Sequence, residues 1–437
     1  MRVGEAIKPL RLPGFGRLAG AYLVNELGNW LGEIALAIVV FDQTGSPVAT
    51  AGLFVAMQFI PALATPPLVA RVDHLPSRAA LGFLYLAEAG AFAALALLAT
   101  GDTFVLALVL VIAAIDGTLA TAARARTRAA AATILEPAEL LREGNGLLNI
   151  GFTAGAAAGP ALAGLIVAEA GAQVALLADA ASFLAVALII TTSRAIPAGV
   201  GGDEDDEGEQ VAWVERMRRG IAYVRERPVL RRLMVAEGVA FIFFALVLPI
   251  EVAFAKETLD AGDVGYGLLL AFWGVGMVLG SVLFSAARNM SLRTLLALGT
   301  LAIGLGYCLT GIAPTLAVAC AASVLGGAGN GIQWVAVVTA IQGLTAQRLQ
   351  ARVLGLLESL ASGMSGAGFL AGGVIAALLE PRAAYLVAGF GVLAVLAIAA
   401  SMLWRTSFEG DARPEDDSPS GPQPAQTQAP GPESAQI

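Results

Sequence analysis

The stretch from Gly144 to Gly171 reads GNGLLNIGFTAGAAAGPALAGLIVAEAG, and it decides the fold. Gly155 and Gly159 are four residues apart, so they lie on one helical face, where a neighbouring backbone can approach closely. Pro160 comes next and predicts a kink in an apolar helix. A shift of 209 residues matches this stretch to a second one, with Gly159, Gly164 and Ile166 falling on Gly368, Gly373 and Ile375. The chain therefore contains the same helix twice.

The composition is that of a protein that lies in a bilayer. Of the 437 residues, 57% are hydrophobic and only 14% are charged, and the mean hydropathy is +0.76. A soluble chain of this composition would lack the polar side chains needed to cover its surface. The two cysteines lie in apolar runs and only one histidine is present, so we expect no disulfide scaffold, no metal site and no cofactor.

Apolar runs of about 20 residues are long enough to cross a bilayer. Twelve of them occur, near 17–41, 47–70, 79–100, 103–123, 145–169, 172–192, 230–255, 264–287, 292–311, 314–338, 353–378 and 383–404. We predict an all-α membrane protein of twelve transmembrane helices in two six-helix repeats. A duplication with both halves inserted the same way up is typical of transporters whose site lies between the halves.

The predicted units follow from these spans and from the charged segments. They are a cytoplasmic N-terminus (1–16), a first six-helix bundle (17–193), a linker with an amphipathic helix (194–228), a second bundle (229–405) and a disordered tail (406–437). The basic residues between spans fall on one side, with Lys256 and Arg382 on the other. The positive-inside rule then predicts that both termini are cytoplasmic.

Nothing in the sequence indicates an enzyme. It contains no phosphate loop of the GxxxxGKS type, no nucleophile elbow and no metal-ligand spacing. The run GGAGNG at Gly326 to Gly331 lies within a predicted span, where close helix packing explains it better than a nucleotide loop. We expect a monomer whose partners are a small-molecule substrate, protons and the lipid bilayer, with no nucleic acid.

Ionisable side chains within a membrane are costly and are therefore functional candidates. Those in the predicted spans are all acidic: Glu26, Glu33, Glu88, Asp116, Asp179, Glu237, Glu251 and Glu358. Glu26, Asn29 and Glu33 share one face of the first helix because they are three and four residues apart. We assign proton coupling and cation recognition to this face. The alternative is that Glu26 or Glu33 only bonds a neighbouring helix or reaches an aqueous end.

The remaining acids differ in depth. Glu88 and Asp116 lie nearest the midplane, and each is either a further proton-coupling or substrate group or an interhelical hydrogen-bond partner. Asp179 and Glu251 lie toward the outer ends, where we expect solvated or capping roles.

Two more groups of residues are candidates by position. Glu237 and Glu358 lie in the inner third and are candidates for a cytoplasmic gate. Four large polar or aromatic residues are candidates for lining the cavity, although packing is an alternative for the tryptophans: Gln58, Trp273, Gln333 and Trp334.

The segment GPALAG at 159–164, preceded by Gly155, resembles the antiporter motif on the fifth helix of the major facilitator superfamily, with Ala163 in place of one glycine. FDQTGSPVATAGL (41–53), DAASF (179–183), GIAYVRERPVLRRL (220–233) and GYGLLLAFWGVGMVLGSVL (265–283) are also similar to its bacterial drug:proton antiporter branch, which includes macrolide and enterobactin exporters. The resemblance covers about 15–404. It implies a protein of the bacterial inner membrane that works by alternating access of two rocking halves, and it assigns Gly155, Gly159, Pro160 and Gly164 to the motif.

The loop after the second helix departs from the family pattern. VARVDHLPSR keeps Asp73 and Arg78, which the resemblance assigns to a cytoplasmic latch, but Val69 replaces a usual glycine and His74 a usual arginine. A mid-membrane arginine on the fourth helix, typical of many proton-coupled relatives, is missing.

An acidic cavity without basic partners favours a cationic or neutral amphipathic substrate. We therefore predict an efflux transporter for compounds of the drug and antibiotic type, driven by proton antiport. A lipid or lysolipid transporter of the same fold is the first alternative, and a non-transporting membrane sensor is the second.

Overall fold

The computed structural model describes residues 7–72, 77–99, 103–193, 218, 220–287 and 289–403. Within these ranges the regular structure is entirely helical, and twelve helices are long and apolar enough to cross a membrane, which confirms the predicted number. A short helical turn, η1 (Lys8–Arg11), precedes them.

The first bundle is formed by the elements between Pro13 and Thr192. They are α2 (Pro13–Thr44), α3 (Pro47–Phe54) continued by η2 (Val55–Phe59) and α4 (Ile60–Val72), α5 (Ser77–Leu98), α6 (Leu106–Leu135) followed by η3 (Glu136–Ala138), α7 (Leu141–Ala170) and α8 (Ala172–Thr192).

The second bundle is formed by the elements between Pro228 and Leu403. They are α10 (Pro228–Ala245) continued by η5 (Leu248–Ile250), α11 (Glu251–Ala253) and η6 (Phe254–Thr258), then α12 (Gly262–Ala286), α13 (Leu292–Gly311), α14 (Leu316–Leu344), α15 (Gln347–Leu378) and α16 (Pro381–Leu403).

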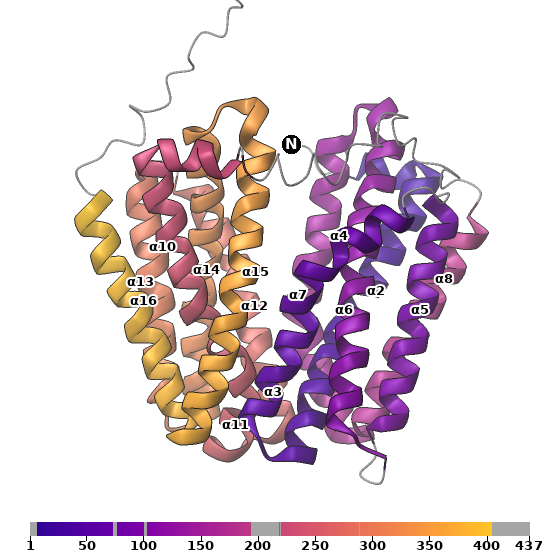
Figure 1. Ribbon diagram of the computed structural model, residues 1–437, viewed down its shortest axis with the longest axis horizontal. Coiled ribbons are helices and arrows are strands. Elements are labelled where there is room, and N and C mark those ends of the chain that lie inside the picture. The colour runs from indigo at the N-terminus through magenta and orange to yellow at the C-terminus, as the bar shows by residue number, and fades with distance from the viewer. Residues whose placement is uncertain are drawn as a thin grey trace, which may run out of the picture.

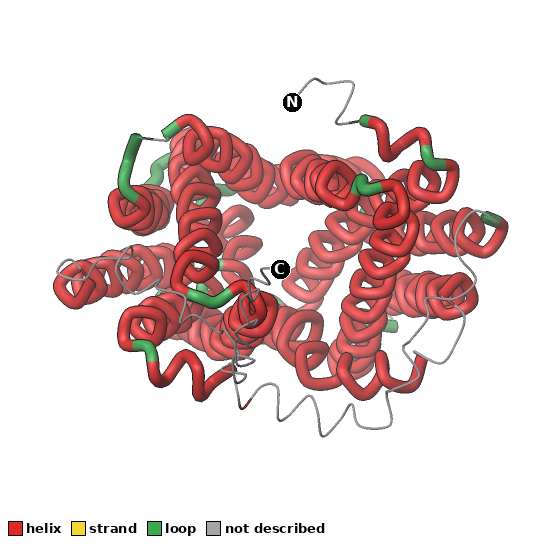
Figure 2. The backbone as a smooth tube through the Cα atoms, turned by 90° about the horizontal axis from the view of Figure 1, so that it is seen from above, coloured by secondary structure: helices red, strands yellow, loops and turns green. Residues whose placement is uncertain are grey.

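The two bundles stand side by side, and Figure 2 shows the same helices from above. We call the end at which α2 begins and α16 ends the terminal face, and the other end the opposite face. The helices α3 and α11 meet near the opposite face, whereas α4 and α15 diverge toward the terminal face (Figure 1). The bundles therefore touch mainly at the opposite face.

The predicted duplication recurs in the packing between the bundles. Helix α7 packs against α12, and its repeat partner α15 packs against α3, the repeat partner of α12. A Cβ atom added to Gly164 would lie 3.1 Å from Cα of Gly267, and one added to Gly373 would lie 2.9 Å from the carbonyl oxygen of Pro47. Equivalent glycines in the two halves therefore allow equivalent close contacts.

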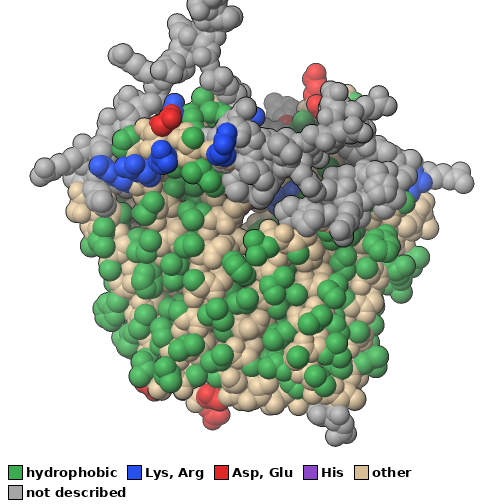
Figure 3. Space-filling model, viewed as in Figure 1, with side chains coloured by type: hydrophobic (Ala, Val, Ile, Leu, Met, Phe, Trp, Pro, Cys, Tyr) green, Lys and Arg blue, Asp and Glu red, His purple; other side chains and the backbone are tan. Residues whose placement is uncertain are grey.

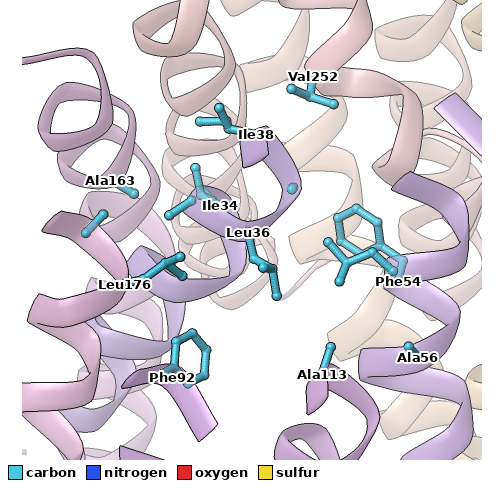
Figure 4. Close-up of a cluster of buried hydrophobic side chains, with 14 of the residues drawn as sticks. Ile34, Leu36, Ile38, Phe54, Ala56, Phe92, Ala113, Ala163, Leu176 and Val252 are labelled. Atoms are coloured by element: carbon cyan, nitrogen blue, oxygen red, sulfur yellow. The ribbon is translucent and has the colours of Figure 1, made fainter. Parts of the chain in front are cut away.

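Helix α2 is the centre of the first bundle. All residues from Ile34 to Phe41 are buried, so this part of the helix is covered on every side. Figure 4 shows Ile34, Leu36 and Ile38 in one hydrophobic cluster with Phe92 and Leu176. An apolar helix that is buried all round is expected in the interior of a bundle rather than at its lipid surface.

The surface carries an apolar belt with basic side chains at one end. Figure 3 shows hydrophobic side chains over the height of the bundles and Lys and Arg side chains gathered at the terminal face. Arg17, Arg231 and Arg293 lie in the first two turns of α2, α10 and α13, which begin at that face. The charge asymmetry read from the sequence therefore coincides with one face of the molecule.

The described part of the predicted linker helix covers residues 220–226. Its Val224 is buried against the second bundle, and the backbone N–H of Ala346 donates a hydrogen bond to the Tyr223 hydroxyl (3.1 Å). The Arg227 guanidinium lies 3.5 Å from the centroid of the Tyr223 ring. The acidic run of the linker and the tail after Leu403 lie outside the described residues.

Candidate functional site

A cavity of about 240 Å³ lies between the two bundles. The first bundle contributes residues of α2, α3 and η2, and the second contributes the larger part of the wall. The lining residues are Trp30, Glu33, Ile34, Phe54, Gln58, Phe244, Val247, Leu248, Glu251, Tyr266, Leu270, Trp273, Met277, Tyr307, Thr310, Ser323 and Tyr385. We call this the central cavity.

Two carboxyl groups face the central cavity, one from each bundle. They belong to Glu33 on α2 and to Glu251 at the start of α11. The Gln58 amide donates a hydrogen bond to Oε1 of Glu33 (3.2 Å). The carboxylate is thus oriented by a neutral donor, and its negative charge is not cancelled by that contact.

Gln58 owes its position to an irregular turn. Residues Val55 to Phe59 form a π-helical turn between α3 and α4. Such turns widen a helix and free a backbone carbonyl, and they occur frequently at functional sites. The Ser362 hydroxyl of α15 donates a hydrogen bond to the carbonyl oxygen of Gln58 (3.4 Å). The turn therefore connects the carboxylate of the first bundle to a helix of the second.

Aromatic rings form much of the wall on the side of the second bundle. Trp273 and Tyr307 are stacked, with centroids 5.1 Å apart and ring planes 13° from parallel. Phe244 lies 5.9 Å from Trp273, and Tyr385 lies 6.2 Å from Tyr307. Ring faces attract cations as well as apolar groups. Among the residues that line this cavity there is no lysine or arginine.

An ion-pair bridge closes the opposite face. Nζ of Lys256 lies 2.5 Å from Oδ1 of Asp42 on α2 and 2.7 Å from Oδ1 of Asp263 on α12. The first pair joins the two bundles, and the second lies within the second bundle. Helix α3 also packs on η5 and α15 at this end. On the other side of the central cavity the helices α4 and α15 diverge toward the terminal face (Figure 1).

The acidic face predicted on α2 is divided between two environments. Glu33 lines the central cavity together with Gln58 and Trp273, two of the candidates for lining it. Glu26 is buried against α7, where a Cβ atom added to Gly155 would lie 3.2 Å from its Cβ, and its Oε1 has no hydrogen-bond partner. Asn29 is half-buried between them.

Four predicted residues of the second bundle lie away from the central cavity. Gln333 is not a lining residue of it, because its amide donates to both carboxyl oxygens of Glu237 (3.1 and 3.0 Å) beside a separate cavity of about 80 Å³. Trp334 is 40% exposed and packs edge-on against Phe241. Glu237 is therefore a bonded group inside its own bundle, and Glu358 is exposed on α15.

The outer-end roles expected for two acids are wrong. Asp179 is fully buried between helices, and Glu251 is 6% exposed in the wall of the central cavity. Glu88 and Asp116 are also buried inside the first bundle. None of the three acids of α5, α6 and α8 lines the central cavity.

The glycines of the antiporter-like motif lie at two helix–helix contacts, one within the first bundle and one between the bundles. Gly155 and Gly159 pack on α2, since a Cβ atom added to Gly159 would lie 2.5 Å from Cβ of Trp30. Gly164 packs on α12 of the other bundle. Pro160 lies inside α7, which continues through it as one helix. Of the predicted cytoplasmic latch, Arg78 lies in the first turn of α5, and Asp73 lies outside the described residues.

Three features of the site were not predicted. Glu251 was misplaced in depth, the tyrosines Tyr266, Tyr307 and Tyr385 were not singled out, and the Lys256 bridge was not foreseen. The tyrosines carried a signal, since hydroxyl-bearing rings inside spans need polar surroundings. Lys256 also carried a signal, since it is one of two basic residues that the sequence places at the opposite face and its charge needs acidic partners there.

Comparisons with known proteins agree with this architecture. A family model described as "transmembrane secretion effector" matches residues 5–429. No curated protein matches the chain in sequence.

Solved transporters are similar in fold. A nucleoside transporter, NupG, has 11% identity and a TM-score of 0.73, covering 90% of this chain and 99% of that chain. A bacterial homologue of the iron transporter ferroportin in an inward-facing state has 15% identity and a TM-score of 0.68, covering 90% and 98%. A bacterial homologue of the lysosomal transporter Spinster, inward-facing and unoccupied, has 16% identity and a TM-score of 0.64, covering 90% and 96%.

The family match spans nearly the whole chain, and the twelve helices, their duplication and the cavity between the halves agree with it. The protein belongs to the transmembrane secretion effector family, a family of transporters of the major facilitator type.

Proposed function

We propose that the protein exports amphipathic cationic or neutral compounds from the cytoplasm by proton antiport. The observation that carries the proposal is the central cavity, which presents two carboxyl groups among aromatic rings and no basic side chain. Glu33 and Glu251 attract the positive charge, while Trp273 and Tyr307 accept the apolar body of the compound. An anionic substrate would need arginine or lysine at these positions.

Export and orientation have separate support. The basic side chains gather at the terminal face, which the positive-inside rule assigns to the cytoplasm. The helices α4 and α15 diverge toward that face (Figure 1), so we propose that this conformation takes up substrate from the cytoplasm. The family description as a secretion effector supports the outward direction. We propose that the protein acts as a monomer in the inner membrane.

The test is transport of tetraphenylphosphonium in inverted membrane vesicles. A lumen made acidic should drive accumulation of the cation, because protons leave the lumen as the cation enters. A protonophore should release it. If accumulation is the same with and without the imposed proton gradient, antiport is wrong. A panel of compounds tested for resistance in an expressing strain then narrows the substrate class.

A lipid or lysolipid transporter is the second candidate. The observation that favours it is an apolar groove between α10 and α16, with Arg231 and Arg232 at its terminal end and Val235, Val239 and Ile398 along it. An acyl chain and an anionic headgroup would suit these surfaces. Competition of lysolipid with the transported cation, together with no resistance phenotype, would favour this alternative over drug export.

A further inference from the structure

Three buried carboxyl groups inside the first bundle have no role in the substrate cavity. Glu88 on α5, Asp116 on α6 and Asp179 on α8 are 1%, 4% and 0% exposed. Helix α5 packs against both α6 and α8, so the element that carries Glu88 lies between the elements that carry Asp116 and Asp179. We call them the acidic trio. Their charges lie near enough to act on one another.

The acidic trio is short of hydrogen-bond partners. Ser182 donates to Oδ1 of Asp179 (3.1 Å). Both carboxyl oxygens of Glu88, Oδ1 of Asp116 and Oδ2 of Asp179 are buried without a partner. An interhelical bonding role would require partners for these atoms. The trio therefore does not behave as a set of structural hydrogen bonds.

An ionised carboxylate without partners is very costly inside a membrane protein. Three such groups that act on one another are more costly still, since like charges repel. Bound protons remove this energetic cost, because they neutralise the carboxyl groups. When one group releases its proton, its negative charge makes the other groups hold their protons more tightly.

Other ionisable groups face the acidic trio from the neighbouring elements. Arg124, about two turns further along α6, is the basic group whose charge acts on Glu88. Tyr85 of α5 lies near Glu88 and shares a hydrogen bond with Thr127 of α6 (3.0 Å). On α2, the charge of Glu26 acts on Tyr85.

Asp179 is in direct contact with the helix that carries the cavity carboxylate. A Cβ atom added to Gly28 or to Gly32 of α2 would collide with the carboxyl group of Asp179. Glu33 follows Gly32 directly and lines the central cavity. If Asp179 lost its proton, the carboxylate would need water or a new hydrogen-bond donor. The close contact with α2 leaves no room for either. Proton release and a displacement of α2 are thus linked.

We propose that Glu88, Asp116 and Asp179 form the proton-binding site of this transporter, separate from the substrate cavity and connected to it through the glycine face of α2. The inference rests on the proposed proton antiport. Of the sequence candidates it keeps Glu88 and Asp116 for the proton, leaves out Glu26 and Glu33, and adds Asp179, which the sequence did not assign to this role. Substrate held by Glu33 shifts α2, and the trio then releases its proton without direct contact between proton and substrate.

The test separates substrate binding from proton release in the purified protein. Tetraphenylphosphonium is added to weakly buffered protein, binding is followed by quenching of tryptophan fluorescence, and released protons are counted with a pH indicator dye. The triple variant Glu88→Gln, Asp116→Asn, Asp179→Asn should still bind, though more weakly than the wild type because binding and proton release are linked, and it should release no protons. The matched control is Glu237→Gln, a buried acid of the second bundle, which should release protons as the wild type does.

Transport gives the second readout. In liposomes the triple variant should exchange labelled cation across the membrane at the wild-type rate but should not accumulate it against a proton gradient. Proton release or gradient-driven accumulation in the triple variant overturns the inference. If the wild type itself ignores the gradient, the proposed antiport is wrong instead. Should the triple variant not fold, Asp179→Asn alone, in which the amide keeps the shape of the side chain, should release fewer protons than the wild type, and release equal to the wild type would overturn the inference.

Discussion

Replacement of Asp42 by asparagine should favour the conformation in which the opposite face is open. The Lys256 bridge is bonded twice, but only the pair with Asp42 joins the two bundles. In an alternating-access cycle this pair exists only while the opposite face is closed, whereas the pair with Asp263 persists in both states. The substitution therefore removes an interaction from one state alone and should shift the conformational equilibrium toward opening.

The size of the shift follows from exposure. The side chains of Lys256 and Asp42 are 22% and 44% exposed, so the pair is of the partly solvated kind. Such pairs contribute about 0.5 to 1 kcal/mol, which corresponds to about a two- to fivefold change in the ratio of the two states. Solvent ions weaken exposed pairs, so the difference between variant and wild type should diminish in 1 M salt, where the Debye length is about 3 Å.

The assay is pulsed electron paramagnetic resonance with spin labels at Gln43 and Glu257, which are exposed at the opposite face on different bundles. Cys308 and Cys320 are first replaced by alanine. The Asp42→Asn variant should show a larger fraction of long distances. The control is Asp260→Asn, which removes an exposed acid from the same face and suits the left-handed backbone there (φ 51°). An unchanged distance distribution in Asp42→Asn, or an equal shift in the control, would refute the reasoning.

Three further predictions concern the central cavity and α7. Glu33→Gln should weaken binding of a lipophilic monocation about tenfold or more in a fluorescence titration while leaving a neutral compound of similar shape unaffected, because a charge attraction is lost. Trp273→Leu should weaken cation binding by about 0.5 to 2 kcal/mol and Trp273→Phe by less, since phenylalanine keeps a ring face. Gly159→Leu should stop transport while the protein still inserts, as vesicle assays and membrane fractionation would report, because its Cβ atom would meet Trp30 at 2.5 Å.

The twelve spans and the duplication were predictable because a bilayer requires continuous apolar runs, and these are visible in any sequence. The glycine pattern also predicted that neighbouring backbones approach closely, and Gly164 and Gly373 both lie at such close contacts between the bundles. What a pattern along one helix cannot give is which helix covers which face. Asp179 is buried because α2 and α5 cover α8. Gln333 does not line the central cavity, because its amide is hydrogen-bonded to Glu237 inside the second bundle.

Depth within a span was the second source of error. The apolar run 230–255 predicts one regular helix, in which depth in the membrane follows from the residue number. After Ala245, however, the chain passes through the 3₁₀ turn Leu248–Ile250 and the π turn Phe254–Thr258. These turns change the rise and the direction of side chains. Glu251 consequently faces the central cavity and does not reach solvent, and Lys256 is directed at the other bundle.

The most direct test of export by proton exchange uses the purified protein in liposomes that enclose a pH-sensitive dye. With the membrane potential clamped by potassium and valinomycin, addition of tetraphenylphosphonium outside vesicles with an acidic lumen should raise the luminal pH as the cation enters. The rise should depend on the carboxyl group of Glu33 and be absent from empty liposomes. Entry of the cation with no change in luminal pH would contradict the account.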